Sequence, residues 1–129
     1  MEPFLVSIGW YNVAAGLALF ALLSPRIGQK VLGEWCRLTA APYSLGDHGA
    51  LWLWWAALTN LFFGAVNVLA AGWEPAAQRA IAWLDLAVYV PFLVLALGAL
   101  RSPRYGRGVW VAVPLFGGWI AWNLHALLG

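Results

Sequence analysis

Four long apolar stretches, separated by short polar connections, dominate the pattern of hydrophobic and polar positions along the chain. They cover residues 4–23, 50–71, 81–100 and 109–128. A helix of about 20 residues, rising about 1.5 Å per residue, crosses the roughly 30 Å hydrocarbon core of a bilayer. The pattern therefore predicts an all-α integral membrane protein with four transmembrane helices in one bundle. The third helix should begin near residue 76, because Pro75 suits the first helical position.

The connection between the first two stretches has a different pattern. Apolar residues recur at offsets of four, four and three from Ile27 to Leu38, and the basic residues lie toward the other side. This spacing predicts a short amphipathic helix over residues 26–39 that lies along the membrane interface. A plain basic linker is the alternative. The connections are too short to bury a core of their own, so residues 1–129 should form one domain.

Composition supports the membrane assignment. Hydrophobic residues make up 64% of the chain and charged residues 9%, whereas soluble domains have about 45–50% and about 25%. The first stretch follows Met-Glu-Pro without a basic region, so we expect it to remain as a membrane helix and not to be a cleaved signal peptide. A single cysteine, Cys36, excludes an internal disulfide. No basic run is typical of nucleic-acid binding.

Basic residues predict the orientation. Six of the seven lie on the first and third connections. They are Arg26, Lys30 and Arg37 on the first connection and Arg101, Arg104 and Arg107 on the third, while Arg79 lies on the second. By the positive-inside rule, the first and third connections face the cytoplasm and both termini face outward. We therefore expect a multi-pass protein of the bacterial inner membrane, in contact with the lipid bilayer.

Asp85 is the one acidic residue within the four apolar stretches. An ionised carboxylate in hydrocarbon is costly, so it should face the bundle and find a partner. At the helical rise, Asp85 and Asn67 lie ~6 Å from the outer ends of their helices, and Asn12 and Tyr89 lie ~12 Å deep. The predicted polar layer consists of Asp85, His125, Asn123, Asn67, Asn12 and Tyr89. We expect His125 to pair with Asp85, because it alone in this layer can carry a positive charge.

Two interpretations of this layer remain open. Its residues can bond between helices and fix the register of the bundle. Alternatively, they can form a pocket or an ion path open to the outer leaflet, because an intramembrane ionisable group is often functional. Such a pocket would be lined by Trp83, Tyr89, Trp119 and Trp122, with Asp85 and Asn123 orienting a polar head group. It would suit a quinone, a pigment or a lipid. No cofactor is predicted, and no metal-ligand spacing or catalytic motif is present.

Two features of the chain carry a resemblance to a known group of proteins. The run Gly16-Leu17-Ala18-Leu19-Phe20 leads into Ser24-Pro25-Arg26, and Ser102-Pro103-Arg104 follows the third stretch at a similar place. In these residues and in its four-helix layout the chain resembles small bacterial membrane proteins grouped as DoxX-like. Some members of that group are subunits of quinone-linked oxidoreductases. The resemblance implies a four-helix membrane fold, and it transfers no catalytic residue.

These observations favour a protein without its own catalysis. We expect an accessory or structural subunit of a larger membrane assembly, in contact with other membrane subunits or with copies of itself. The alternative is a binding or transport module for an apolar, ring-bearing ligand. A proton-coupled drug exporter of four helices is a third interpretation. Such exporters have an acidic residue in the first helix, whereas the first stretch here offers Asn12.

Overall fold

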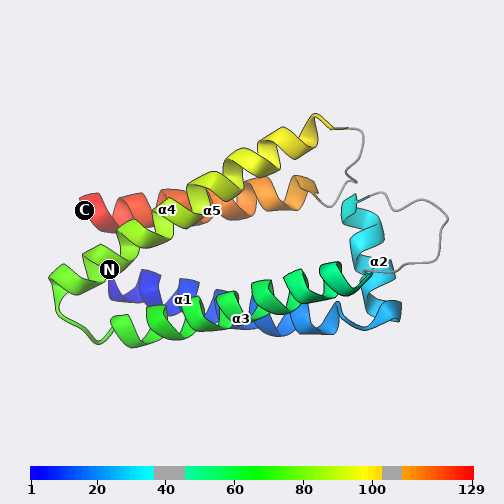
Figure 1. The fold of residues 1–129 in the computed structure, drawn as a ribbon. Coiled ribbons are helices and arrows are strands. Elements are labelled where there is room, and N and C mark those ends of the chain that lie inside the picture. The colour runs from blue at the N-terminus through cyan, green and yellow to red at the C-terminus, as the bar shows by residue number, and fades with distance from the viewer. Residues whose placement is uncertain (37–45, 103–108) are drawn as a thin grey trace.

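The computed structural model describes the fold of residues 1–36, 46–102 and 109–129, which form five helices (Figure 1). The helices are α1 (Glu2–Ala21), α2 (Pro25–Cys36), α3 (Gly46–Ala70), α4 (Pro75–Leu100) and α5 (Val109–Leu128). Four of them, α1, α3, α4 and α5, are long and apolar enough to cross a membrane. The prediction of an all-helical fold with four such helices is therefore confirmed.

Helix boundaries agree with the sequence pattern to within a few residues. Helix α1 begins two residues before the apolar stretch and has a proline in its first turn. Proline is tolerated there, because the N–H that it lacks would have no partner within the helix. Pro75 occupies the start of α4, as expected, with Glu74 as the residue before the helix. Helix α3 begins at Gly46, four residues before the apolar stretch. The helix predicted after residue 25 is present as α2, whereas Arg37 and Leu38 lie outside the described residues.

The first two membrane-length helices, α1 and α3, are antiparallel and pack backbone against backbone. A Cβ atom added to Gly64 would lie 2.7 Å from the carbonyl oxygen of Gly9. One added to Gly16 would lie 2.8 Å from the carbonyl oxygen of Ala57. No side chain fits in either place, so these glycines allow the close approach. Gly117 and Gly118 on α5 have no neighbour within 4 Å of an added Cβ, and they make no such contact.

Helices α4 and α5 form a second antiparallel pair, which lies beside the α1–α3 pair (Figure 1). Both chain termini and the short turn from α3 to α4 lie at one end of the molecule, called the termini end below. Helix α2 runs across the other end, called the α2 end (Figure 1). The two pairs pack far more extensively within themselves than against each other. The contacts between the pairs therefore decide how the molecule is held together.

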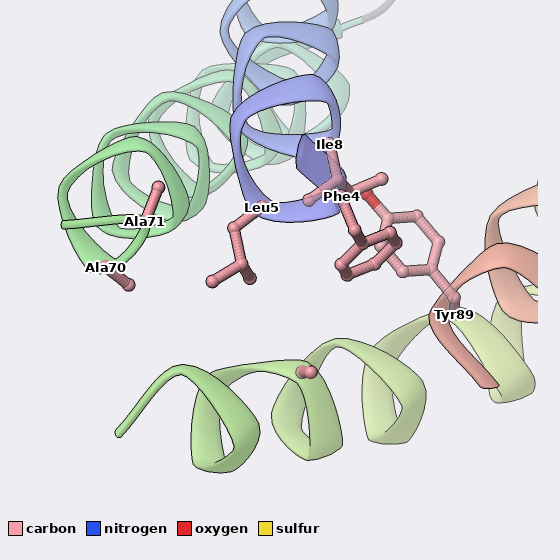
Figure 2. Packing of buried hydrophobic residues seen from close by; sticks show 7 residues of the cluster. Phe4, Leu5, Ile8, Ala70, Ala71 and Tyr89 are labelled. Carbon is pink, nitrogen blue, oxygen red and sulfur yellow. The ribbon is translucent and has the colours of Figure 1, made fainter. Parts of the chain in front are cut away.

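The buried apolar core lies in the half of the molecule nearest the termini end. It brings together Phe4, Leu5 and Ile8 from α1, Ala70 and Ala71 at the end of α3, and Ala82 and Tyr89 from α4. Figure 2 shows the side chains of α1 pointing between the ends of α3 and α4. Small alanines on α3 and α4 leave room for the larger side chains of α1. This core closes around the polar residues described next.

A candidate polar site in the bundle core

Five polar side chains, Asn12, Asn67, Asp85, Tyr89 and Asn123, are buried between the termini end and the middle of the helices. We call this set the polar core. Its members come from all four membrane-length helices. In the hydrocarbon interior of a membrane no water is available to satisfy such groups, so each hydrogen bond within the core matters.

Asn67 on α3 and Asp85 on α4 are both fully buried and share a hydrogen bond. The Asn67 Nδ2 donates to Asp85 Oδ1 at 3.1 Å. The same nitrogen donates to the carbonyl oxygen of Phe63, one turn back on α3, at 3.0 Å. This second bond holds the amide in place on its own helix. The pair therefore joins α3 to α4 through a carboxyl group whose partner is neutral.

A second bond joins α4 to α1 one turn deeper. The Tyr89 hydroxyl donates to Asn12 Oδ1 at 2.8 Å, and Asn12 Nδ2 donates to the carbonyl oxygen of Ile8 at 3.0 Å. Asn12 thus resembles Asn67 in its local arrangement, because each amide nitrogen bonds to the carbonyl four residues earlier in its own helix. In both cases the amide also bonds to a side chain of α4: Asn12 accepts through its oxygen, and Asn67 donates through the same nitrogen.

Helix α5 contributes Asn123, whose Nδ2 donates to the carbonyl oxygen of Ala82 at 2.8 Å. That carbonyl lies one helical turn before Asp85 on α4, so Asn123 reaches α4 close to the carboxyl group. The acceptor of this bond is a backbone carbonyl, which the sequence pattern could not identify. It joins the two helices of the second pair.

The expected pairing of Asp85 with His125 is not what the structure shows. His125 is exposed on the surface of α5, and Asp85 has Asn67 as its partner. Asn123 and His125 are two residues apart, so a helix turns them about 200° away from each other. Since Asn123 faces α4, His125 faces outward. Trp83 is likewise exposed, at 58% of its surface, and lies outside the polar core that it was expected to line.

An aromatic cluster covers the polar core on the side of α5. Trp119 and Trp122 stack with their ring centroids 5.6 Å apart. Phe4 meets both rings edge-on at 6.4 and 5.9 Å, and Tyr11 lies 5.3 Å from Trp119. These contacts join α1 to α5, so the aromatic rings and the polar core connect the same two helix pairs. Phe4 was not among the expected site residues. Its position beside Pro3 places it in the first turn of the first helix, at the termini end.

Four buried polar atoms have no hydrogen-bond partner among the described residues. They are Asn67 Oδ1, Asp85 Oδ2, Asn123 Oδ1 and Trp119 Nε1. Three of the four are acceptors that belong to the polar core. Leaving a buried polar group unpaired costs about 1–3 kcal/mol. The polar core therefore has more acceptors than donors, and this imbalance is its main chemical property.

Three of the six basic residues expected at the membrane interface are described by the structure, and they lie at the α2 end. Arg26 and Lys30 are exposed on α2, and Arg101 is exposed at the end of α4. Arg37, Arg104 and Arg107 lie outside the described residues. Among the residues that the structure describes, no group of three His, Cys, Asp or Glu side chains is placed to hold a metal ion.

Comparisons with protein-family models, with curated proteins and with solved structures found no match to this chain. The fold and the polar core define its class: a small helical protein with four helices of membrane-spanning length, closed at one end around a buried carboxyl group. The features that bear on its function are its exposed surface and the chemistry of that core.

Proposed function

We propose that this chain is a multi-pass protein of the bacterial inner membrane that serves as an accessory or structural subunit of a larger membrane assembly. The observation that carries the proposal is Trp10. It lies near the middle of α1 and is 60% exposed, on the outside of the molecule. Tryptophan prefers the headgroup level of a bilayer, where its N–H can be hydrated. Lipid at the middle of a span offers no such partner.

The exposed position of Trp10 favours a protein neighbour over lipid. An unpaired N–H in hydrocarbon is costly, whereas a partner helix can supply an acceptor. Ala14 and Leu17 are exposed at the next positions of the same face of α1. A large ring beside a small residue gives a face into which another helix can pack. Trp52 and Trp55, by contrast, are exposed near the α2 end, where the headgroup level alone accounts for them.

A Trp10→Leu substitution tests this proposal. The protein would be solubilised gently from its native membrane and sized, with co-purifying proteins identified. We expect the wild type to run as part of a larger assembly and Trp10→Leu to release it. Trp55→Leu is the matched control, because Trp55 is 67% exposed but lies near the α2 end. A wild-type protein that runs as a lone monomer would contradict the proposal.

We further propose that the α2 end faces the cytoplasm and that both termini face outward. The support is the exposed basic residues Arg26, Lys30 and Arg101 at that end. Helix α2, with Ile27 and Val31 exposed beside them, would lie along the inner membrane interface. We also propose that the chain is related to the DoxX-like proteins that it resembles.

A second candidate function is the binding of an apolar, ring-bearing ligand such as a quinone, pigment or lipid from the outer leaflet. It is favoured by the stacked rings of Trp119 and Trp122, because Trp122 is 40% exposed while Trp119 has a buried N–H without a partner. A ring that inserted beside Trp122 would extend the stack. Extraction of the purified protein with organic solvent tests this: a stoichiometric compound that is lost in Trp122→Leu supports it, and an empty extract from folded protein contradicts it.

A further inference from the structure

The polar core is short of donors around its one carboxyl group. Asp85 Oδ1 accepts from Asn67, but within the described part of the chain Asp85 Oδ2 has no partner, and neither do the amide oxygens of Asn67 and Asn123. All three side chains are buried to 99% or more. Buried acceptors normally have a hydrogen-bond partner, so three unpaired ones in the polar core require an explanation.

Turning the amides over would not supply these donors. Asn67 Nδ2 already faces two acceptors, the carbonyl of Phe63 and Asp85 Oδ1. Asn123 Nδ2 faces the carbonyl of Ala82. Exchanging nitrogen and oxygen in either side chain would set oxygen against oxygen. Their orientation is therefore determined by the surroundings, and the shortage of donors is a property of the arrangement.

No positive charge meets Asp85 among the described residues. Helix α3 presents Asn67 to it. Besides Asp85, the titratable side chains of α1 and α4 that are not exposed are the hydroxyls of Tyr11 and Tyr89. The cationic candidates are Arg79 on α4, His125 on α5 and the amino group of Met1. The two side chains are exposed, and none of the three bonds to Asp85 among the described residues. An ionised carboxylate without a countercharge in this setting would be strongly disfavoured.

We propose that Asp85 is an intramembrane proton-binding site, and that the neutral carboxyl group is the form that joins the two helix pairs. A hydronium ion transfers its proton to Oδ2: one O–H bond of the hydronium breaks, one forms at Oδ2, and a water molecule is left. The new O–H then donates to a neighbouring amide oxygen. With Asn67 the product is a ring of two hydrogen bonds between a carboxylic acid and a primary amide. One proton thereby satisfies two of the unpaired atoms.

Release of this proton would weaken the joint between the helix pairs. Among the described residues, two hydrogen bonds between side chains join α4 to helices α1 and α3, and the bond from Asn67 to Asp85 is one of them. An ionised Asp85 would draw water or a cation into the contact, and the pairs would loosen. Proton binding would thus set the state of the bundle, whatever assembly the protein serves.

The test uses the small number of aspartates in the chain. There are two, Asp47 and Asp85. In Asp47→Asn protein labelled with carbon-13 at the aspartate carboxyl, Asp85 alone gives a signal. Solid-state NMR of this protein in lipid vesicles reads its protonation directly. We expect the chemical shift of a protonated carboxyl group at neutral pH. A carboxylate shift at neutral pH would overturn the proposal.

Two controls keep the test decisive. Labelled Asp85→Asn protein retains Asp47 alone, which assigns the second signal in the wild type if Asp47→Asn fails to fold. Repeating the measurement in sodium and in choline buffers separates a proton from a metal ion. A signal that changes with pH and not with sodium supports a proton site. A carboxylate signal that shifts with sodium would show that a cation occupies the site instead.

Discussion

The hydroxyl of Tyr89 on α4 donates a 2.8 Å hydrogen bond to the amide oxygen of Asn12 on α1, across 77 residues of sequence. Together with the bond from Asn67 to Asp85, it joins the α4–α5 pair to the α1–α3 pair at a depth where lipid provides no competing partner. The stability of the molecule should therefore depend on these few polar contacts and on the close packing of α1 with α3. Other polar groups should contribute little.

Tyr89→Phe should lower stability by about 1 kcal/mol. The substitution keeps the ring, which lies 5.9 Å from that of Phe116, and removes the donor to Asn12. The amide oxygen of Asn12 then remains buried without a partner, and this sets the cost. Thermal unfolding in detergent measures the loss. Tyr11→Phe is the control, because Tyr11 contributes its ring to Trp119. An equal loss in both variants would mean that the hydroxyl of Tyr89 contributes no more to stability than the hydroxyl of Tyr11.

Asn67 and Asp85 should behave as a coupled pair. We expect Asn67→Leu and Asp85→Leu each to destabilise the protein, and the double variant to be no worse than the poorer single variant, because the two side chains share one bond. A parallel cycle with Asp85→Leu and His125→Leu should be additive to within about 0.5 kcal/mol. Chemical or thermal unfolding of the six proteins measures both cycles. Coupling in the second cycle and not in the first would contradict the arrangement described here.

Asp85→Asn should reduce the pH dependence of stability. If the folded protein keeps a proton at Asp85 that the unfolded chain has already released, the wild type loses stability as the pH rises, until the folded protein releases that proton too. Asparagine stays neutral at every pH and retains a donor toward the amide oxygens of the polar core. We expect the unfolding temperature of the wild type to fall as the pH rises from about 4, where an unfolded aspartate ionises, through neutral pH. The profile of this variant should fall less over the same range. Glu74→Gln, at an exposed position in the turn before α4, is the matched control and should follow the wild type.

Gly64→Ala should be strongly destabilising for its size. The added methyl group would lie 2.7 Å from the backbone oxygen of Gly9, so α1 and α3 must move apart. Overpacking of this kind costs about 1–3 kcal/mol. Gly117→Ala on α5 is the matched control, because nothing lies within 4 Å of its added methyl group. Alanine also favours helix over glycine by up to about 1 kcal/mol. Thermal unfolding of the two variants should therefore give changes of opposite sign or of clearly different size.

Cysteine accessibility should reveal the orientation. In a Cys36→Ser background, we expect a cysteine at Glu74 to react with an impermeant reagent on spheroplasts, and one at Gln29 to react only after the membrane is opened. Both positions are exposed. Gln78 on the same side is less suitable, because its side chain donates to the carbonyls of Ala71 and Trp73 in the turn after α3. Labelling at position 29 in intact spheroplasts would reverse the proposed orientation.

Position along the helix axes is what the sequence predicted best. The rise of a helix and the thickness of a bilayer are both constant, so the distance of a residue from the end of its span places it along the membrane normal. Residues placed at ~6 Å, Asn67 and Asp85, are hydrogen-bonded to each other, and so are those placed at ~12 Å, Asn12 and Tyr89. The four membrane-length helices and α2 were found by the same reasoning from local pattern.

The direction in which each side chain points was decided only by the tertiary structure. A helix in lipid is apolar on every face, because lipid and the protein interior are equally apolar, so no amphipathic stripe shows which side is inside. His125 has a depth that suits Asp85 but faces outward, while Asn123 faces α4. The close pairing of α1 with α3 likewise depends on glycines from two helices meeting at one place. Rotation about the helix axis is set by how all the helices pack at once, and no local stretch of sequence contains that information.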